Sequence, residues 1–232
     1  DPKDRRTRTI PADFNFQFAQ NLNGLSLQSK RIGLLSSGSE DSEGNKLLSK
    51  ATEILGKLGA DVIPISETKE YPGEEELFVL LFEFREGINK YLRKANSDLQ
   101  NLNQLIVFNN ENRDLAMEHF GQEIFIESAQ TLGQRSKYMR SVEFTTKESR
   151  DYIDGLLNKY NLNALVGLTR GPAWLINYNG GDEQAIENQR SWGNGGFAAM
   201  SGYPHITIPF GLVDGLPVGI SFISTAWDDK SI

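Results

Sequence analysis

The sequence has 232 residues, of which 38% are hydrophobic and 24% charged, and its formal net charge is −7. This composition is typical of a globular protein with a sizeable core, and the negative charge argues against nucleic acid as a partner. The absence of cysteine excludes disulfides and thiolate metal ligands and leaves the compartment open, with the cytoplasm favoured. No apolar run approaches the roughly 20 residues of a membrane-spanning helix, so we expect no membrane association.

The first 30 residues are polar and irregular, which predicts a solvated connecting segment. A short buried strand, Arg31–Leu35, and a second strand, Asp61–Ile65, then flank an amphipathic helix that Gly59 ends. The apolar face of this helix consists of Leu47, Leu48, Ala51, Ile54, Leu55 and Leu58. A strand, a helix and a strand with short joints predict a βαβ crossover and parallel pairing. Pro64 cannot donate to a ladder, so the second strand is expected to end there or to lie at an edge.

The middle of the chain is predicted to be helical. One long helix is expected to carry an apolar face formed by Leu77, Leu80, Leu81, Phe84, Ile88, Tyr91 and Leu92. Phe78 and Phe82 widen this face, so more than one neighbour is expected to cover it. Residues 102–108 suit a short helix or a strand, since periodicity does not decide between them, and residues 124–132 suit a helix. A further helix is predicted to begin near Thr145, because Thr145 and Glu148 have the spacing of a capping box.

The last third of the chain supplies three more strands. Residues 164–168 form an apolar run typical of a buried strand, and residues 205–210 and 217–223 form two others. The turn signal Asp214-Gly215 lies between these two, which predicts an antiparallel hairpin. The expected fold is therefore α/β, with a mixed, largely parallel sheet covered by helices. No repeat or long linker indicates a division into separate domains.

Several polar groups invite a chemical interpretation, but a structural one is favoured for each. Ser36–Ser39 follows a strand and has Lys30 shortly before it, yet a polar turn with capping serines explains these residues. His119 stands in a polar, helix-like run and His205 inside an apolar strand, and neither has the neighbours of a catalytic triad along the chain. The spacing of these two histidines matches no metal site.

Two glycine-rich loops and one loop after a strand are candidate ligand sites. Asn179–Asp182 and Gly193–Gly196 lack the features of phosphate-binding and dinucleotide-binding loops. For the second loop, close backbone packing is favoured over a loop shaped around a ligand. Thr169–Trp174 directly follows a strand, and ligands in open α/β sheets bind at the carboxyl ends of strands. Trp174 suits either a pocket wall or a cover for the sheet edge.

The most specific pieces of the chain resemble the C-terminal half of the amidase signature family. These pieces are Ala198–Gly211, which contains Gly-Tyr-Pro and Ile-Pro-Phe-Gly, then Gly215–Gly219, which reads Gly-Leu-Pro-Val-Gly, and Ala226-Trp227. Asp1–Thr7 resembles the Asp-Pro-x-Asp segment that follows the family's catalytic half. Phe82–Asn89 resembles a segment of simple-amidase and peptide-amidase relatives.

The resemblance implies an amide hydrolase that needs no cofactor and acts on a small-molecule amide. In the family, one serine attacks the amide carbonyl, a second relays its proton to a neutral lysine, and backbone N–H groups hold the oxyanion. This sequence has no Gly-Gly-Ser-Ser run and no matching lysine, so no catalytic residue is assigned and the isolated chain is expected to be inactive. The residues that the resemblance suggests for the substrate pocket wall are Trp174, Thr169, Gly171, Phe84 and Asn177.

The resemblance also implies the architecture and the partners of the chain. Residues 1–232 are expected to be the C-terminal portion of an amidase domain, whose partner is the missing N-terminal half of the same enzyme, with a homodimer as another arrangement. Asn188–Gly193 departs from the segment found in subunits that amidate mischarged tRNA, which favours a free-standing amidase. A fragment of such an amidotransferase A-type subunit and a non-catalytic binding or scaffold module remain as alternatives.

Overall fold

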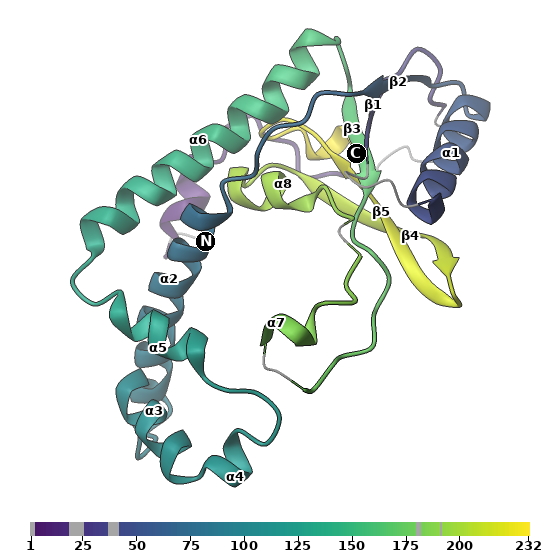
Figure 1. The fold of residues 1–232 in the computed structure, drawn as a ribbon. Coiled ribbons are helices and arrows are strands. Elements are labelled where there is room, and N and C mark those ends of the chain that lie inside the picture. The colour runs from purple at the N-terminus through teal and green to yellow at the C-terminus, as the bar shows by residue number, and fades with distance from the viewer. Residues whose placement is uncertain (1–2, 19–25, 37–41, 180–181, 191) are drawn as a thin grey trace. The chain divides into compact units, whose positions relative to one another are not determined.

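The structure is a computed structural model that describes residues 3–18, 26–36, 42–179, 182–190 and 192–232 (Figure 1). The chain folds into two compact units. The first unit contains residues 1–70, 149–173 and 190–232, and the second contains residues 71–148 and 174–189. Two short 3-10 helices, η1 (Arg5–Thr9) and η2 (Asp229–Ser231), belong to the first unit. No helix in the described ranges is long and apolar enough to cross a membrane.

A five-stranded sheet with the order β2-β1-β3-β5-β4 forms the centre of the first unit. Its strands are β1 (Arg31–Leu35), β2 (Asp61–Ile65), β3 (Ala164–Leu168), β4 (His205–Val213) and β5 (Leu216–Ile223). β1 pairs in parallel with β2 and β3, whereas β5 is antiparallel to both β3 and β4. The expected α/β fold with a mixed sheet is confirmed. β2 lies at an edge of the sheet, as Pro64 indicated.

The β4–β5 hairpin turns at Asp214 and Gly215, where the sequence predicted it. Both residues have positive φ, 53° and 80°, which is the conformation that tight hairpin turns require. β4 runs further than predicted, to Val213. The pairing of β4 with β5 is irregular between Pro209 and Gly211 and then resumes, so the residues up to the turn still belong to the ladder.

Helix α1 (Ser42–Lys57) covers one face of the sheet (Figure 1). Its contacts bury a cluster formed by Ile32, Ala51, Leu55, Val166 and Ile220. Gly59 follows the helix with φ 96°, which confirms the predicted helix end. Ile54 and Leu58, which were expected on the buried face, are exposed instead. They line an open groove between α1 and β4, together with Ile206 and Ile208 of β4.

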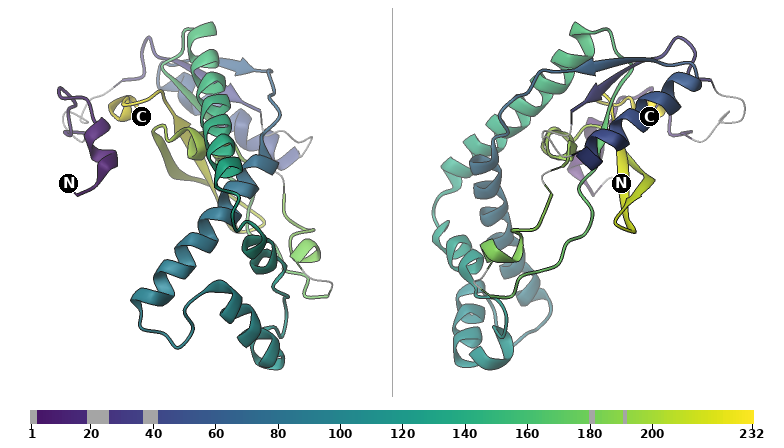
Figure 2. Two further views of the ribbon diagram at one scale, coloured as in Figure 1. Left: turned by 90° about the vertical axis from the view of Figure 1, so that its left-hand side faces the viewer. Right: turned by 45° about the vertical axis from the view of Figure 1, so that its right-hand side comes forward.

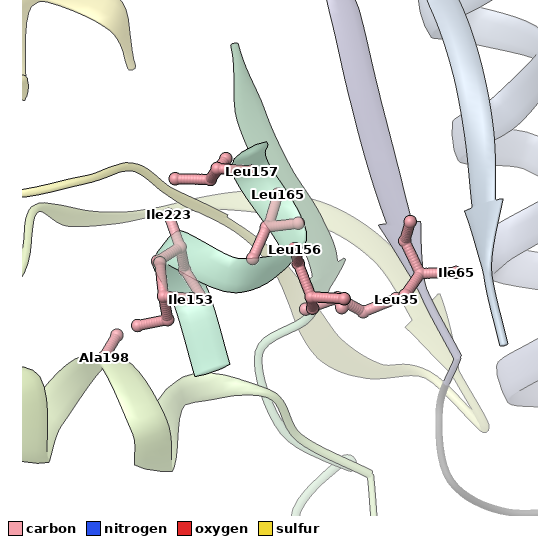
Figure 3. Close-up of a cluster of buried hydrophobic side chains, with 8 residues drawn as sticks. All are labelled: Leu35, Ile65, Ile153, Leu156, Leu157, Leu165, Ala198 and Ile223. Carbon is pink, nitrogen blue, oxygen red and sulfur yellow. The ribbon is translucent and has the colours of Figure 1, made fainter. Parts of the chain in front are cut away.

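The other face of the sheet is covered by the last turns of α6 (Arg135–Lys159) and by α8 (Gly195–Ser201). Figure 3 shows the resulting cluster, in which Ile153, Leu156 and Leu157 of α6 meet strand residues and Ala198 of α8. The strand residues in this cluster are Leu35, Ile65, Leu165 and Ile223. Because neighbouring residues of a strand point to opposite faces, the two helical layers bury alternate residues of the same strands.

The second unit consists mainly of helices. They are α2 (Gly73–Lys94), α3 (Leu102–Glu111), α4 (Arg113–Ala116), α5 (Glu123–Gln130), the start of α6 and α7 (Asp182–Ala185). α2 packs against α3 and α5, which lie beside it in the teal part of the chain (Figure 2). Residues 102–108, which the sequence allowed to be a helix or a strand, form a helix. Its N-cap is Asn101, whose Oδ1 accepts a hydrogen bond from the backbone N–H of Gln104 at 3.0 Å.

The predicted helix start at Thr145 is wrong. α6 begins at Arg135 and runs through Thr145 without interruption. The Thr145 hydroxyl donates to the carbonyl oxygen of Ser141, one turn earlier in the same helix, at 2.9 Å. A threonine can satisfy its hydroxyl in this way inside a helix, so the spacing to Glu148 was not a terminal signal.

The predicted buried face of α2 is also partly wrong. Of the expected residues, Leu81 and Leu92 are buried, while Leu77, Leu80, Phe84 and Tyr91 are exposed. Phe82, which was expected to widen this face, is buried, and its ring stacks on Tyr138 of α6 with centroids 4.3 Å apart. α2 has apolar residues over more than one stripe, so periodicity did not determine which stripe its neighbours cover.

Candidate functional site

The carboxyl end of β3 brings Thr169 and Gly171 out of the core of the first unit. β3 is fully buried, and Thr169 is the first partly exposed residue after it. The backbone N–H of Thr169 donates to the carbonyl oxygen of Gly219 at 2.9 Å, so this point of the chain remains fixed to β5. A Cβ atom on Gly171 would lie 2.8 Å from the carbonyl oxygen of Arg190, so glycine permits this close approach.

A cluster of hydroxyl groups lies beside Thr169 on the sheet face that α8 also covers. Its centre is Ser221 of β5, which is fully buried. The Ser221 hydroxyl is 2.7 Å from the Thr169 hydroxyl, 3.1 Å from the Thr207 hydroxyl and 2.7 Å from Nε2 of His205. The Thr169 and Thr207 hydroxyls are themselves 3.5 Å apart, a distance at which a hydrogen bond is weak. The cluster therefore connects the end of β3 to β4 and β5 through polar side chains.

His205 does not belong to a catalytic triad. Its ring contacts Ser221, but no carboxylate in the described part of the chain is hydrogen-bonded to it. Burial lowers the pKa of His205 below its ordinary value of 6.5, so the imidazole is neutral at neutral pH. The buried Ser221 hydroxyl is inaccessible to a substrate carbonyl. The second histidine, His119, lies in a bend rather than a helix and packs against Phe120 and Tyr178.

The loop Gly193–Gly196 packs directly on the same end of the sheet. Gly193 has φ 148°, and a Cβ atom there would lie 3.0 Å from the carbonyl oxygen of Thr169. A Cβ atom on Gly195 would lie 3.1 Å from the His205 ring. These close approaches support backbone packing, the favoured interpretation of this loop.

The other residues suggested for the pocket wall lie in the second unit. Trp174 is half-buried, and its indole N–H donates to the carbonyl oxygen of Ala185 at 2.9 Å. Asn177 belongs to the same loop, where its Nδ2 donates to a Glu187 carboxylate oxygen at 2.8 Å. Phe84 is exposed on α2 and stacks on Phe125 of α5 with centroids 5.2 Å apart. The structure thus groups Thr169 with Gly171 in one unit and Trp174 with Asn177 in one loop of the other.

The sequence did not single out Ser221 or Thr207. Ser221 interrupts an otherwise apolar strand and shares a sheet face with Gly219 and Ile223, because alternate residues point the same way. Finding this signal requires the register between β4 and β5, in which Thr207 stands opposite Ser221. Single-strand patterning does not supply that register.

Two of the polar loops fall partly outside the described residues. The residues outside the described ranges are Ser37, Gly38 and Ser39 of the serine run and Gly180 and Gly181 of the first glycine-rich loop. Ser36 is described, and it is exposed. Within the described ranges, no group of three or more histidine and acidic side chains is arranged to hold a metal ion.

Comparison with known proteins gives consistent similarities along the whole chain. A family model described as Amidase matches residues 1–232. A probable amidase of Arabidopsis thaliana is 28% identical over 231 residues, which cover 96% of this chain and 40% of that protein. The structure of native peptide amidase from Stenotrophomonas maltophilia has 32% sequence identity and a TM-score of 0.84, covering 100% of this chain and 46% of that one.

A more distant structure shares the fold. An amidase family protein from Bacillus anthracis has 23% identity and a TM-score of 0.66, covering 88% of this chain and 37% of that one. In each of these comparisons, the chain spans less than half the length of the relative that it matches.

Proposed function

Because this chain belongs to the amidase family, we propose that it forms the C-terminal half of an amide hydrolase and supplies the sheet and part of the substrate pocket wall. The observation that carries this proposal is the similarity to peptide amidase. It extends over all of this chain at a TM-score of 0.84, yet it accounts for only 46% of the amidase chain. The remainder of such an enzyme is where we place the catalytic groups.

The side chains of the described residues support this assignment of roles. Nucleophilic catalysis needs an accessible hydroxyl beside a base, together with donors for the oxyanion. In the described part of the chain, the serine that is hydrogen-bonded to a histidine is Ser221, and it is buried. Our proposal therefore places the nucleophile, the proton relay and the base of the enzyme in residues outside this chain.

The proposed contribution of this chain is substrate binding. Thr169 and Gly171 follow the carboxyl end of β3, which is where open α/β sheets bind ligands. Trp174 and Asn177 follow a few residues later, and Phe84 offers an exposed aromatic ring. The indole N–H of Trp174 already has a partner in Ala185, so the ring is available as an apolar surface for an acyl group.

An ammonia-release assay tests the proposal. The full-length protein that carries this chain is incubated with small aliphatic amides, aryl amides and peptide amides, and released ammonia is measured. We expect release from at least one of these classes, without added metal or cofactor. Failure to release ammonia from all three classes, by a protein that unfolds cooperatively, would reject the proposed activity.

A further inference from the structure

The hydrogen bonds around Ser221 restrict how each neighbouring group can bond. A serine hydroxyl has one proton to donate and two lone pairs that accept. Three groups lie within hydrogen-bond distance of Ser221 Oγ, namely His205 Nε2 and the hydroxyls of Thr169 and Thr207. Because Ser221 is fully buried, these partners must satisfy it. Ser221 therefore donates to one of the three and accepts from the other two.

The state of His205 determines which group receives the Ser221 proton. A neutral imidazole carries its proton on one nitrogen and accepts on the other. The contact fits either tautomer: a proton on Nε2 would be donated to Ser221, whereas with the proton on Nδ1 the ring accepts from Ser221 and both threonine hydroxyls donate to it. In the second arrangement, the Thr169 proton is donated to Ser221, and the Thr169 oxygen is left to accept a hydrogen bond.

The packing around Thr169 leaves room for this arrangement. A Cβ atom on Gly219 would lie 3.0 Å from the Thr169 hydroxyl and 2.8 Å from the methyl group of Thr207, so glycine keeps this side of the cluster open. Thr169 is partly exposed, whereas Ser221 is fully buried beneath it. A group at the carboxyl end of β3 can therefore reach the Thr169 hydroxyl, while Thr207 and His205 of the edge strand β4 are exposed as well.

We propose that Thr169 accepts a hydrogen bond from the N–H of the substrate's amide group, and that Ser221 and His205, with its proton on Nδ1, are positioning residues that hold the Thr169 hydroxyl as an acceptor. This inference rests on the proposed function and gives Thr169 a specific role within it. An ester has no N–H at the scissile bond but undergoes the same attack at its carbonyl carbon. The interaction should therefore favour amides over esters of the same acid.

The test compares kcat/KM for a primary amide and for the methyl ester of the same acid, using the full-length enzyme. Thr169→Val removes the hydroxyl and keeps the side-chain shape. We expect it to lower kcat/KM for the amide by about tenfold, because the substrate N–H loses its partner, and to change the ester value by less than about twofold. Thr169→Ser retains the hydroxyl and should restore the amide-to-ester ratio.

The other members of the cluster supply the matched variants. Ser221→Ala should shift the amide-to-ester ratio in the same direction as Thr169→Val, because Thr169 then loses the group that takes its proton. Thr207→Val removes a hydroxyl from the same cluster and should leave the ratio unchanged. Melting temperatures identify any variant that fails to fold. If Thr169→Val fails to fold, Thr169→Ala takes its place in the comparison.

Three results would overturn the inference. Equal losses for amide and ester in Thr169→Val would show a merely structural role, and no loss for either substrate would show no role in binding. A wild-type enzyme that hydrolyses the ester but not the amide would also contradict the inference. If the wild-type protein hydrolyses neither substrate, the proposed function itself fails, which distinguishes that outcome from the others.

Discussion

Trp174 is the residue whose proposed role is most open to a direct test. Its ring is half-buried, and one hydrogen bond to Ala185 ties it to its own loop. In the full-length enzyme, Trp174→Ala should change the ratio of kcat/KM between bulky and small acyl groups by about tenfold, because a pocket wall selects by size. The melting temperature should change little.

A matched variant separates the contribution of the aromatic ring from that of the indole N–H. Trp174→Phe keeps an aromatic ring and loses the indole N–H, so it should retain most of the acyl preference. If Trp174→Ala instead slows all substrates equally and lowers the melting temperature strongly, the residue belongs to the core of its unit and not to a pocket wall.

Some of the site residues could be predicted from the sequence, and others could not. Thr169 and Trp174 could be proposed because they directly follow an apolar strand, which is a local signal. Ser221 could not, because its partner Thr169 is 52 positions away in the sequence and His205 is 16 away. Such a cluster exists only once the register of three strands is fixed, and no single segment encodes that register.

At the level of elements, strands and short crossovers were the most predictable parts. The βαβ unit and the β4–β5 hairpin follow from local apolar patterns and from glycine positions. The start of α6 was not predictable in this way, because Thr145 lies inside the helix and satisfies its hydroxyl there. Helix ends depend on which side chains actually cap the backbone, and Asn101 does so for α3.

The α3 cap provides a prediction about helix stability. Asn101→Ala removes the oxygen that accepts from the backbone N–H of Gln104. We expect the free energy of unfolding to fall by about 1 kcal/mol, as for other N-cap replacements. Asn101→Asp keeps an accepting oxygen and is the control, measured by the same denaturant titration. An unchanged unfolding free energy in Asn101→Ala would mean that the cap contributes nothing to α3.

A second element-scale prediction concerns Glu67, which joins the segment after β2 to the end of α6. Its carboxylate accepts hydrogen bonds from the Lys159 ammonium and from the Tyr160 hydroxyl. These two hydrogen bonds lower the pKa of Glu67 to about 2, and the bond from Lys159 has the larger effect. A carboxyl group with a lowered folded-state pKa stabilises the fold above its unfolded pKa and loses that effect as pH falls through the folded value.

Glu67→Gln should therefore have a lower melting temperature than the wild type at neutral pH. The difference should shrink as pH falls from about 4.5 toward about 2, because the wild-type carboxylate then becomes protonated. Glu53→Gln breaks an exposed ion pair within α1 and is a control that should have little effect. A gap between Glu67→Gln and wild type that stays constant over this pH range would contradict the assigned role of the carboxylate.

At the scale of the whole molecule, the sheet of the first unit is covered unevenly. An open, mainly apolar groove of about 580 Å³ runs beside α1 on one face, and its lining includes Ile206 and Ile208 of the edge strand β4. Each of these isoleucines is 43% exposed. Apolar surface of this kind, next to an unpaired strand edge, promotes association.

We therefore expect the isolated 232-residue chain to dimerise or aggregate, as measured by sizing chromatography with light scattering. Ile208→Lys places a charge in the groove and should reduce association. Leu212→Lys is the control, since Leu212 is exposed on the same strand but does not line the groove. A stable monomer with a sharp cooperative melt and no binding of an apolar dye would contradict this expectation and favour an independent module.

Ammonia release by the isolated 232-residue chain is the most direct test of the central claim that catalytic groups come from outside it. The chain and the variant Lys30→Ala, Ser36→Ala, Ser37→Ala are incubated with the amides that the full-length enzyme hydrolyses. We predict no turnover by either protein, because the proposed enzyme draws its nucleophile and its base from outside this chain. Turnover by the chain that the triple substitution abolishes would contradict this prediction and place a catalytic site within these residues.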